Sequence, residues 1–347
     1  MKKEMNTQER KQNNVIVIIF VVLLGVVLAV AIVLAVKKNR ADIPAASIDE
    51  NVAEESTEIE KWQEGTVSYN GKRYRYNTAI KTYLFMGIDK AGTVEEAEDG
   101  ISGGQSDAMF LLVEDANTQK LSIIAINRNT MAMVDVYDEA GNYVGQRKLQ
   151  ICLQHGYGDG MRTSCLRTVD AVSRLFYQLP ISGYLSLQME AVPALNDAVG
   201  GVNVEVMDDI ENEVLGVSLK KGETITLNGN EAYAYLRSRD LNEFASASRR
   251  LERQQQYLIG FLSQAKGTAL TGERAVMQIY DSISDYMVTN IDFVDLVTEA
   301  KDYTFDDSCM YSVPGELLMG VQFEEYYVDD DALYEMIIDI FYEPVEE

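Results

Sequence analysis

The sequence predicts an α/β fold, an αβα sandwich with a central mixed β-sheet flanked by helices, preceded by one N-terminal transmembrane helix. Two observations support this prediction. Beyond about residue 75, short apolar runs of strand length alternate with segments whose apolar residues recur at helical spacing. Before them, residues 15–36 form 22 consecutive uncharged positions, mostly Val, Ile, Leu and Ala. The 347 residues suffice for such an anchor and for one large or two small folded units.

The uncharged run has the length of a membrane anchor. As a helix rising 1.5 Å per residue, residues 15–36 span roughly the 30 Å hydrocarbon core of a bilayer. A cleaved signal has a shorter apolar run of about 7–15 residues, and Lys37 and Lys38 end this one, so we expect a retained anchor. Basic residues flank it almost equally, so the positive-inside rule leaves the orientation open. Residues 1–14 then form a tail, and residues 37–75 a largely polar and acidic stalk.

The folded part divides into expected strands and helices by the period of its apolar residues. Apolar runs predict strands at residues 82–87, 108–113, 121–126 and 202–206. Helical spacing predicts helices at residues 163–177, 191–198, from about 231, and 250–263. We assign residues 76–270 to the main domain. The acid-rich residues 271–347, which also contain Tyr, Phe and Ile, favour a strand and an amphipathic helix packed on that domain.

Charge indicates an anion site within an acidic protein. The chain carries 30 Lys and Arg against 55 Asp and Glu, a formal net charge of −25. Nevertheless five arginines and no lysine fall within residues 237–253. Arg presents a planar fork of donors that grips phosphate at two points, whereas Lys acts as a point charge. An Arg cluster on an acidic background predicts a site for a specific anion and argues against a nucleic-acid surface, which needs a broad basic patch.

The spacing of these arginines predicts a clamp for a doubly charged group such as a pyrophosphate. Arg237 and Arg239 are two apart and share a face if the chain there is extended. Arg250 and Arg253 are three apart on one face of a helix, near a start whose N–H groups also favour anions. The alternative is that each Arg pairs with a surface acid, a contact worth about 0–1 kcal/mol.

Two acids and a further arginine are expected beside the same site. Asp89 directly follows one predicted strand and Asp107 opens the next, across a Gly-rich loop. Ligands of α/β folds bind at such strand ends, and two carboxylates can hold Mg²⁺ or Mn²⁺, with phosphate oxygens and water as the remaining ligands. The alternative is an Asp that caps a turn. Arg128, after the third strand, faces the same mouth.

Cysteine and histidine usage leaves alternatives open. Three cysteines form no dense disulfide framework. Cys152 and Cys165 either pair or are buried apolar thiols. His155, the only histidine, is either catalytic or hydrogen-bonded to the backbone of its Gly-rich turn.

Several segments together resemble the LytR–CpsA–Psr family. The segments occur in the family's order between about residues 80 and 265: 84–89 (LFMGID), 105–109 (QSDAM), 126–130 (INRNT), 155–160 (HGYGDG), 197–202 (DAVGGV), 227–229 (LNG), 237–239 (RSR) and 250–254 (RLERQ). The resemblance implies a single-pass membrane protein with a cytoplasmic N-terminus and an extracytoplasmic main domain. It also implies transfer of a glycopolymer phosphate from a polyprenyl-pyrophosphate carrier to a peptidoglycan hydroxyl, with the lipid tail in an apolar slot.

The resemblance also implies roles for the residues found above. Asp89 and Asp107 fall where the family binds its metal, and Arg128 and Asp107 are the expected catalytic residues. In such a site, arginines and a divalent cation neutralise the charge on the transferred phosphoryl group. With Arg253 from the clamp, the expected pyrophosphate-binding residues are Arg128, Arg237, Arg239, Arg250, Arg253 and Gln254.

Three positions depart from the family pattern. Gln105 replaces an Arg common in the family, Asn129 replaces an Asp, and Ala247 replaces a polar residue that is often Asp. Amides cannot act as general bases. Two alternatives to the transferase follow: a weak or inactive module that binds the same lipid carrier in a regulatory or scaffolding role, and a hydrolase of that carrier.

Overall fold

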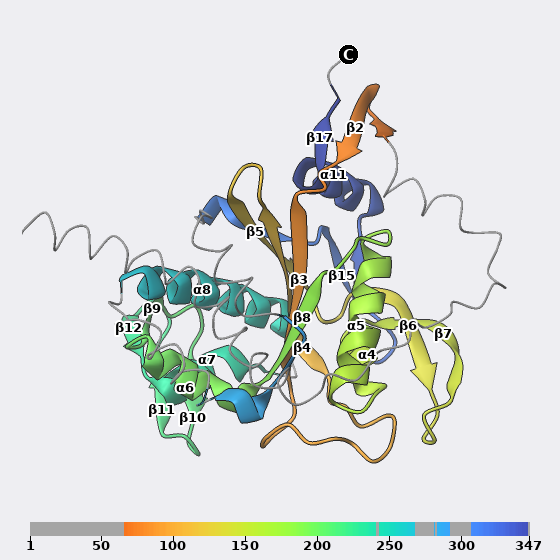
Figure 1. Ribbon diagram of the computed structural model, residues 1–347. Helices are drawn as coiled ribbons and strands as arrows, with labels where there is room; N and C mark the ends of the chain where they lie inside the picture. The colour runs from red at the N-terminus through yellow and green to blue at the C-terminus, as the bar shows by residue number, and fades with distance from the viewer. Residues whose placement is uncertain (1–65, 241–242, 268–280, 282, 292–306, 346–347) are drawn as a thin grey trace, which may run out of the picture.

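A six-stranded mixed sheet forms the centre of the protein (Figure 1). The computed structural model describes residues 66–240, 243–267, 281, 283–291 and 307–345. The strand order is β13-β8-β3-β4-β5-β14, with β3/β8 and β5/β14 parallel and the other pairs antiparallel. The strands are β3 (Ile80–Ile88), β4 (Ser106–Asp115), β5 (Lys120–Ile126), β8 (Gly183–Gln188), β13 (Met287–Thr289) and β14 (Met310–Ser312). The expected mixed sheet is confirmed.

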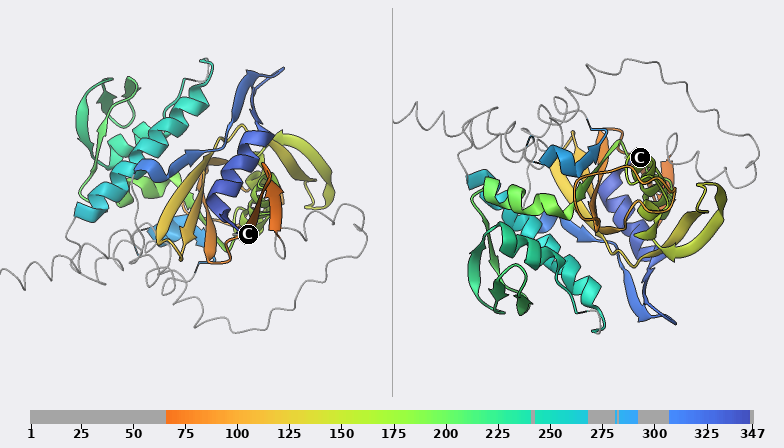
Figure 2. Two further views of the ribbon diagram at one scale, coloured as in Figure 1. Left: turned by 90° about the horizontal axis from the view of Figure 1, so that it is seen from above. Right: turned by 90° about the horizontal axis from the view of Figure 1, so that it is seen from below.

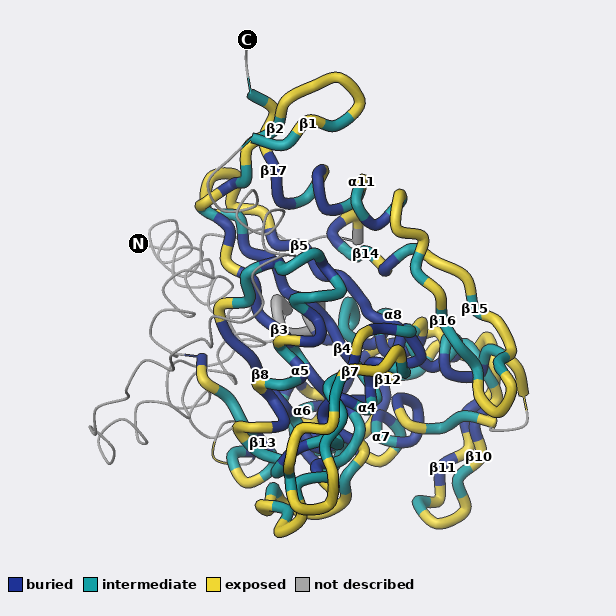
Figure 3. Tube along the Cα trace, turned by 90° about the vertical axis from the view of Figure 1, so that its right-hand side faces the viewer, coloured by how far each residue is buried: buried dark blue, intermediate teal, exposed yellow. Residues whose placement is uncertain are grey.

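The central strands are apolar on both faces because both faces are covered. In β4, Phe110 and Leu112 belong to the core on one face, while Leu111 and Val113 belong to the core on the other. Strands buried on both sides read as continuous apolar runs, which is why 108–113 was recognisable in the sequence. In Figure 3 these strands are almost wholly buried.

Helices cover both faces of the sheet, which makes the fold an α/β sandwich (Figure 2). One face carries α6 (Val192–Ala198), α7 (Gly229–Arg237) and α8 (Ser246–Gly267). The opposite face carries α4 (Leu153–Gly156), α5 (Arg162–Leu175) and α11 (Asp330–Phe341). The expected helices 163–177 and 191–198 correspond to α5 and α6, and the helix expected from 250 begins four residues earlier, at Ser246.

Smaller sheets and hairpins surround the sandwich. Their strands are β1 (Thr66–Tyr69), β2 (Lys72–Tyr76), β6 (Met131–Tyr137), β7 (Tyr143–Gln150), β9 (Val202–Glu205), β10 (Ile210–Asn212), β11 (Val217–Leu219), β12 (Thr224–Leu227), β15 (Gly315–Met319), β16 (Glu324–Val328) and β17 (Tyr342–Pro344). Short 3-10 helices are η1 (Met189–Ala191), η2 (Ser284–Tyr286) and η3 (Asp307–Cys309). β17 pairs with β2, so the two ends of the described chain lie side by side.

The structure revises two of the expected segment boundaries. Residues 66–75, expected as the end of the stalk, lie in β1, β2 and the turn between them, and Tyr74 packs against the core to which α11 contributes. The region 271–347 does more than pack on the outside, since β13 and β14 are edge strands of the central sheet and α11 contributes Leu333 and Phe341 to a core.

The expected anchor lies outside the described residues, as do residues 1–14 and most of the stalk. Within the described part of the chain, no helix combines the length and apolar character needed to cross a membrane.

Candidate functional site

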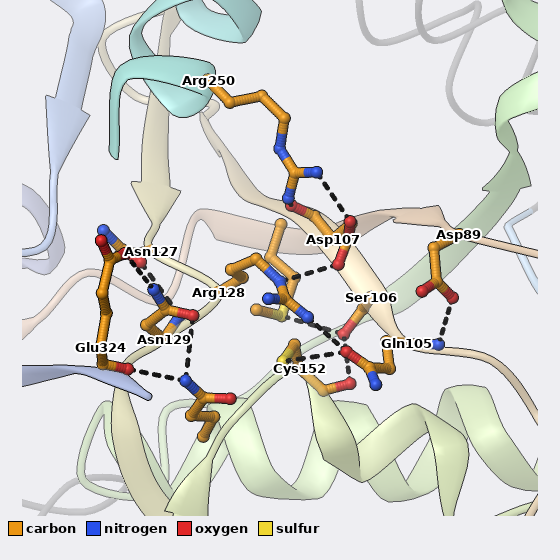
Figure 4. Close-up of polar contacts among 12 residues, drawn as sticks. Asp89, Gln105, Ser106, Asp107, Asn127, Arg128, Asn129, Cys152, Arg250 and Glu324 are labelled. Carbon is orange, nitrogen blue, oxygen red and sulfur yellow. Dashed lines mark hydrogen bonds and ion pairs between the residues drawn. The ribbon is translucent and has the colours of Figure 1, made fainter. Parts of the chain in front are cut away.

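Two acids and two arginines predicted from the sequence meet at one end of the central sheet (Figure 4). The Asp107 carboxylate lies between two guanidinium groups, with Oδ1 2.7 Å from Arg128 Nε and Oδ2 2.8 Å from Arg250 Nη1. Arg250 also donates to the Asp107 carbonyl at 3.3 Å. The side chains of Asp107, Arg128 and Arg250 are only 15%, 10% and 5% exposed. One carboxylate thus faces two buried cations, which leaves this part of the site positively charged.

A bulge in the sheet gives Asp107 its position. Gly87 on β3 pairs with Ala108 on β4, but the next residue, Ile88, pairs with Ser106. Asp107 is therefore the extra residue on β4. A bulge bends the strand and re-aims the side chain at the bulged position. Here it places the Asp107 carboxylate between arginines from the loop after β5 and from α8.

Four buried polar atoms of this site make no hydrogen bond to any described residue: Asp107 Oδ1, Arg128 Nε, Arg250 Nε and Gln254 Oε1. Arg128 Nε and Asp107 Oδ1 form an ion pair, but not at a hydrogen-bonding angle. About nine in ten buried polar groups find a hydrogen-bond partner, so a group of unsatisfied donors and acceptors in one place fits a polar ligand. Burial lowers the pKa of Arg250, an effect that Asp107 partly opposes, and a guanidinium remains charged even so.

Asp89 completes the site beside Asp107. Its Oδ1 accepts a hydrogen bond from the Gln105 N–H at 2.7 Å, and its own N–H donates to the Gln105 carbonyl at 3.0 Å. Solvent reaches the outer side of Asp89, yet burial of the inner side, with the nearby charge of Asp107, raises the pKa of its carboxyl. Two neighbouring carboxylates of this kind favour a cation between them.

The carboxylates fit a hard divalent cation. No cluster of three or more His, Cys, Asp and Glu side chains suited to a metal occurs among the described residues, so the protein offers Asp89 and Asp107. Mg²⁺ is commonly held by one or two carboxylates, with water and substrate phosphates as the other ligands. The two carboxylates match this preference. Burial, and to a smaller extent the charge of Asp107, raise the pKa of Asp89, and a bound cation would stabilise its ionised form.

Three other predicted arginines lie apart from this cluster or are engaged elsewhere. Arg237 is not in extended chain but is the last residue of α7, where it is exposed and donates to the Tyr233 hydroxyl. Asn228 and Glu231 cap the start of α7 reciprocally, with hydrogen bonds of 3.1 and 2.8 Å, and the helix ends at Arg237, where the Ser238 N–H donates to the Ala234 carbonyl. Arg237 therefore does not share a face with Arg239.

Arg239 and Arg253 border a separate cavity of about 320 Å³ that is lined mainly by charged side chains. The positive charge of Arg239 is close enough to lower the pKa of Arg250. Arg253, by contrast, is 4% exposed and its donors bind Asp208 at 2.6 Å, the Tyr235 carbonyl at 2.9 Å and the Ser238 carbonyl. It fastens α8 to α7 in this structure. Since α8 begins at Ser246, Arg250 and Arg253 also lie beyond its first turn, where the helix dipole has little effect.

His155 and the cysteines take the structural roles that the sequence allowed. His155 is 1% exposed, and its Nδ1 lies 3.1 Å from the Gly104 carbonyl, to which it donates. Burial lowers the pKa of His155 to about 4, so the ring is neutral at pH 7. Cys152 and Cys165 are free buried thiols, and burial raises the pKa of Cys152 to about 11.

An apolar cavity of about 190 Å³ adjoins the charged cluster. Gly87 and Ala108 line it next to Asp107, and Gln254 lies at the same wall. Apart from Gln188, the remaining walls are apolar side chains of β3, β4, β8, η1, α6, α7 and α8, among them Tyr257 and Phe261. A hydrophobic slot that opens beside buried arginines can accept a molecule with an apolar chain and an anionic head.

Two contacts of the site were not foreseen from the sequence. Gln105, which departs from the family pattern, accepts a hydrogen bond from Arg128 Nη2 through its Oε1. Glu324, in β16, accepts from Asn129 Nδ2 at 3.2 Å and from the Ala245 N–H at 2.5 Å. Glu324 is 195 residues from Asn129 and lies in an acid-rich region, so no local pattern distinguished it.

Comparison with known proteins agrees with this architecture. The LytR_cpsA_psr family matches residues 41–337. The Bacillus subtilis (strain 168) polyisoprenyl-teichoic acid–peptidoglycan teichoic acid transferase TagV is 25% identical over 258 residues, 72% of this chain and 60% of TagV. The transferase of the same name, TagU, from Enterococcus faecalis is 27% identical over 241 residues, 69% of this chain and 70% of TagU.

Solved structures share the fold. The crystal structure of B. subtilis TagV has a TM-score of 0.58 at 24% identity, covering 75% of this chain and 95% of that one. The structure of TagT bound to LI-WTA has a TM-score of 0.54 at 18% identity, covering 76% and 90%. With a family match over most of its length and a sheet and helices arranged as in these structures, the chain belongs to the LytR_cpsA_psr family.

Proposed function

We propose that this protein is a membrane-anchored, extracytoplasmic phosphotransferase that moves a glycopolymer phosphate from a polyprenyl-pyrophosphate carrier to a peptidoglycan hydroxyl. The single observation that best supports this function is the junction of two unlike environments. The buried cluster of Asp107, Arg128 and Arg250 lies directly beside an apolar cavity. A polyprenyl pyrophosphate joins the same two chemistries in one molecule. The teichoic acid transferase names of TagU and TagV support the same class of reaction.

Each part of the site has a task in this reaction. The apolar cavity holds the first part of the isoprenoid chain, where burial contributes about 0.8 kcal/mol per CH₂ group. Arg128 and Arg250 bind the pyrophosphate oxygens and stabilise the charge that develops on the transferred phosphoryl group. Asp107 holds both guanidinium groups in place before the substrate arrives. Asp89 and Asp107 would hold Mg²⁺ or Mn²⁺, which when bound supplies additional charge neutralisation at the pyrophosphate.

Transfer by the full-length chain in detergent tests the proposal. The donor is a short polyprenyl-pyrophosphate-linked saccharide, the acceptor is a soluble peptidoglycan fragment, and both products are followed by mass spectrometry. We expect Arg128→Ala and Arg250→Ala each to reduce transfer by about 100-fold or more, the scale of losing one electrostatic contact in a transition state. Arg73→Ala is the matched control, because Arg73 is exposed on β2, away from the site.

The outcomes separate this proposal from its alternatives. Equal transfer by Arg128→Ala, Arg250→Ala and Arg73→Ala would refute the assigned site. If the saccharide phosphate is released to water at the same rate with and without acceptor, the protein is a hydrolase of the carrier. Tight donor binding with neither product would identify a lipid-binding module.

A further inference from the structure

A third cavity lies beside Asp89 and Gln105. It has a volume of about 440 Å³ and opens between the end of β3, the loop that precedes β4, and α4. Its walls include Asp89, Ser102, Gly104, Gln105 and Tyr157. Four of the eight residues that line it have polar side chains, and the others are Ile101, Leu153 and two glycines, whereas apolar side chains dominate the apolar cavity.

The two cavities approach the cluster from opposite faces of the sheet. Helices α6 and α8 line the apolar cavity, and both belong to one face. The polar cavity is lined by α4, whose Leu153 packs against the core of the other face. At the site end of β3, Gly87 borders the first cavity and Asp89 borders the second. Along the chain, Gln105 lines the polar cavity and Ala108 lines the apolar cavity, and Asp107 lies between these two residues.

This arrangement matches the direction of a phosphoryl transfer. In such a reaction the attacking and the leaving oxygen lie roughly in line on opposite sides of the phosphorus. With the isoprenoid in the apolar cavity, the leaving polyprenyl phosphate departs toward α6 and α8. The attacking hydroxyl must then approach from the opposite side, on which the polar cavity opens.

We propose that the polar cavity is the binding site for the acceptor saccharide, the hydroxyl-bearing sugar that receives the glycopolymer phosphate. This inference rests on the proposed transferase function. The hydroxyl oxygen forms a bond to the glycan-linked phosphorus while the bridging P–O bond to the polyprenyl phosphate breaks. Polyprenyl monophosphate leaves with the bonding electron pair, and the hydroxyl proton is released to water through the open cavity. The acceptor and the glycan end joined by a phosphodiester.

The walls of the cavity suit a sugar. Tyr157 offers an aromatic ring, and Ser102 and Gln105 offer polar side chains. Gly104 leaves the wall beside Asp89 without a side chain. A larger residue is disfavoured there because φ is +83° and an added Cβ would lie 2.9 Å from Ile88 Cγ2. The hydrogen bond from buried His155 fixes the Gly104 carbonyl. The only histidine of the chain thus shapes this cavity.

The test blocks the polar cavity and leaves the rest of the site intact. Ser102→Trp places a large ring there from an exposed loop position, and Ser68→Trp places the same ring at an exposed position on β1 as the matched control. Tyr157→Ala removes the aromatic wall, and Tyr157→Phe keeps it. The full-length variants are assayed for donor Kd by calorimetry and for kcat and KM with a soluble peptidoglycan fragment as varied substrate.

We expect Ser102→Trp and Tyr157→Ala to raise the KM for the peptidoglycan fragment about tenfold or more, the equivalent of one lost aromatic contact. Donor Kd should stay within about twofold of the wild type, because the binding groups for the pyrophosphate are unchanged. Tyr157→Phe should restore most of the acceptor affinity. If wild-type and Ser68→Trp proteins transfer the glycan and Ser102→Trp does so with the same KM, the acceptor site lies elsewhere and only this inference is overturned. If the wild type binds donor but transfers nothing, the proposed function fails and the acceptor site fails with it.

Discussion

Restoring the family's acid at position 129 should damage this protein unless Glu324 is changed as well. Asn129 is 2% exposed, and both its side-chain nitrogen and its side-chain oxygen form hydrogen bonds (Figure 4). Its Nδ2 donates to Glu324 Oε2 at 3.2 Å, and its Oδ1 accepts from Gln150 Nε2 at 3.1 Å. Asn129→Asp replaces the donor with a carboxylate oxygen. Two carboxylates then face each other where a hydrogen bond was.

The size of the effect follows from that distance. Two unit charges 3.2 Å apart repel by about 5 kcal/mol at an effective dielectric constant of 20. The pair can escape by taking up one proton, which for a carboxyl of ordinary pKa costs about 4 kcal/mol at pH 7 and about 1.5 kcal/mol at pH 5. We therefore expect Asn129→Asp to lower the free energy of unfolding by about 3–4 kcal/mol at pH 7 and by less than half of that at pH 5. The loss grows as pH rises because the folded variant holds a proton that the unfolded chain releases.

The double variant Asn129→Asp/Glu324→Gln should reverse the loss. The amide introduced at position 324 can donate to the carboxylate introduced at position 129, so the bond is re-formed with donor and acceptor exchanged, and we expect stability within about 1 kcal/mol of the wild type. Urea unfolding at pH 5 and pH 8 measures both variants, with donor Kd as a second readout. An Asn129→Asp protein as stable as the wild type at pH 8, or a double variant no better than the single one, would refute this reasoning.

Three further predictions concern the arginines, His155 and Asp89. Arg250→Lys loses the two hydrogen bonds to Asp107 and should weaken binding of the polyprenyl-pyrophosphate substrate about tenfold. Arg253→Lys should lower the free energy of unfolding by about 1–3 kcal/mol and leave the Kd of that substrate nearly unchanged. Calorimetry measures the Kd and urea unfolding the stability, and the reverse pattern would contradict the two assignments. His155 has a folded pKa of about 4 against about 6.5 when unfolded, so acid protonates the unfolded chain first and stability falls by about 3 kcal/mol between pH 6.5 and pH 4; urea unfolding of His155→Gln should lack this slope. Burial and Asp107 raise the pKa of Asp89, so ionisation of this carboxyl lowers the stability of the folded wild type as the pH rises above the unfolded pKa. In the absence of divalent ions, Asp89→Asn should therefore have a higher Tm than the wild type at pH 7 and the same Tm at pH 3. The variant should also lose transfer activity.

The parts of the fold that sequence reasoning could reach are those with a local signature. Strands 82–87, 108–113 and 121–126 fall inside β3, β4 and β5 because strands covered on both faces need unbroken apolar runs. Helices 163–177 and 191–198 were visible from apolar spacing alone. The edge strands β13 and β14 are three residues each, and their pairing with β8 and β5 depends on contacts far along the chain. Length and periodicity carry no signal for such strands.

In the candidate site too, residues with a local sequence signal were predicted, and features that depend on distant pairing were not. Asp89, Asp107, Arg128 and Arg250 could be brought together because strand ends and loops of an α/β sheet converge at one edge. The extended conformation expected for Arg237 was wrong, because Arg237 is the last residue of α7. A motif as short as Arg-Ser-Arg does not indicate whether its residues belong to a strand or to the end of a helix. The bulge at Asp107 depends on the pairing of β4 with β3, which no single strand reveals.

The departures at positions 129 and 247 are related through Glu324. In the family pattern each position is often an acid, whereas this chain has Asn129 and the buried Ala247 near the start of α8. One oxygen of the Glu324 carboxylate accepts from the Asn129 side chain, and the other accepts from the N–H of Ala245, which directly precedes α8 and lies two residues before Ala247. A negative charge at the N-terminus of a helix is stabilising, and the Glu324 carboxylate supplies it while it also accepts the hydrogen bond from the Asn129 amide. β16 thus supplies a carboxylate against Asn129 and near the start of α8. Such an arrangement favours a site adapted around Glu324 over one that has decayed. Since the Tyr326 N–H also donates to the Asn129 carbonyl at 2.9 Å, the β15–β16 hairpin supports the loop that carries Arg128.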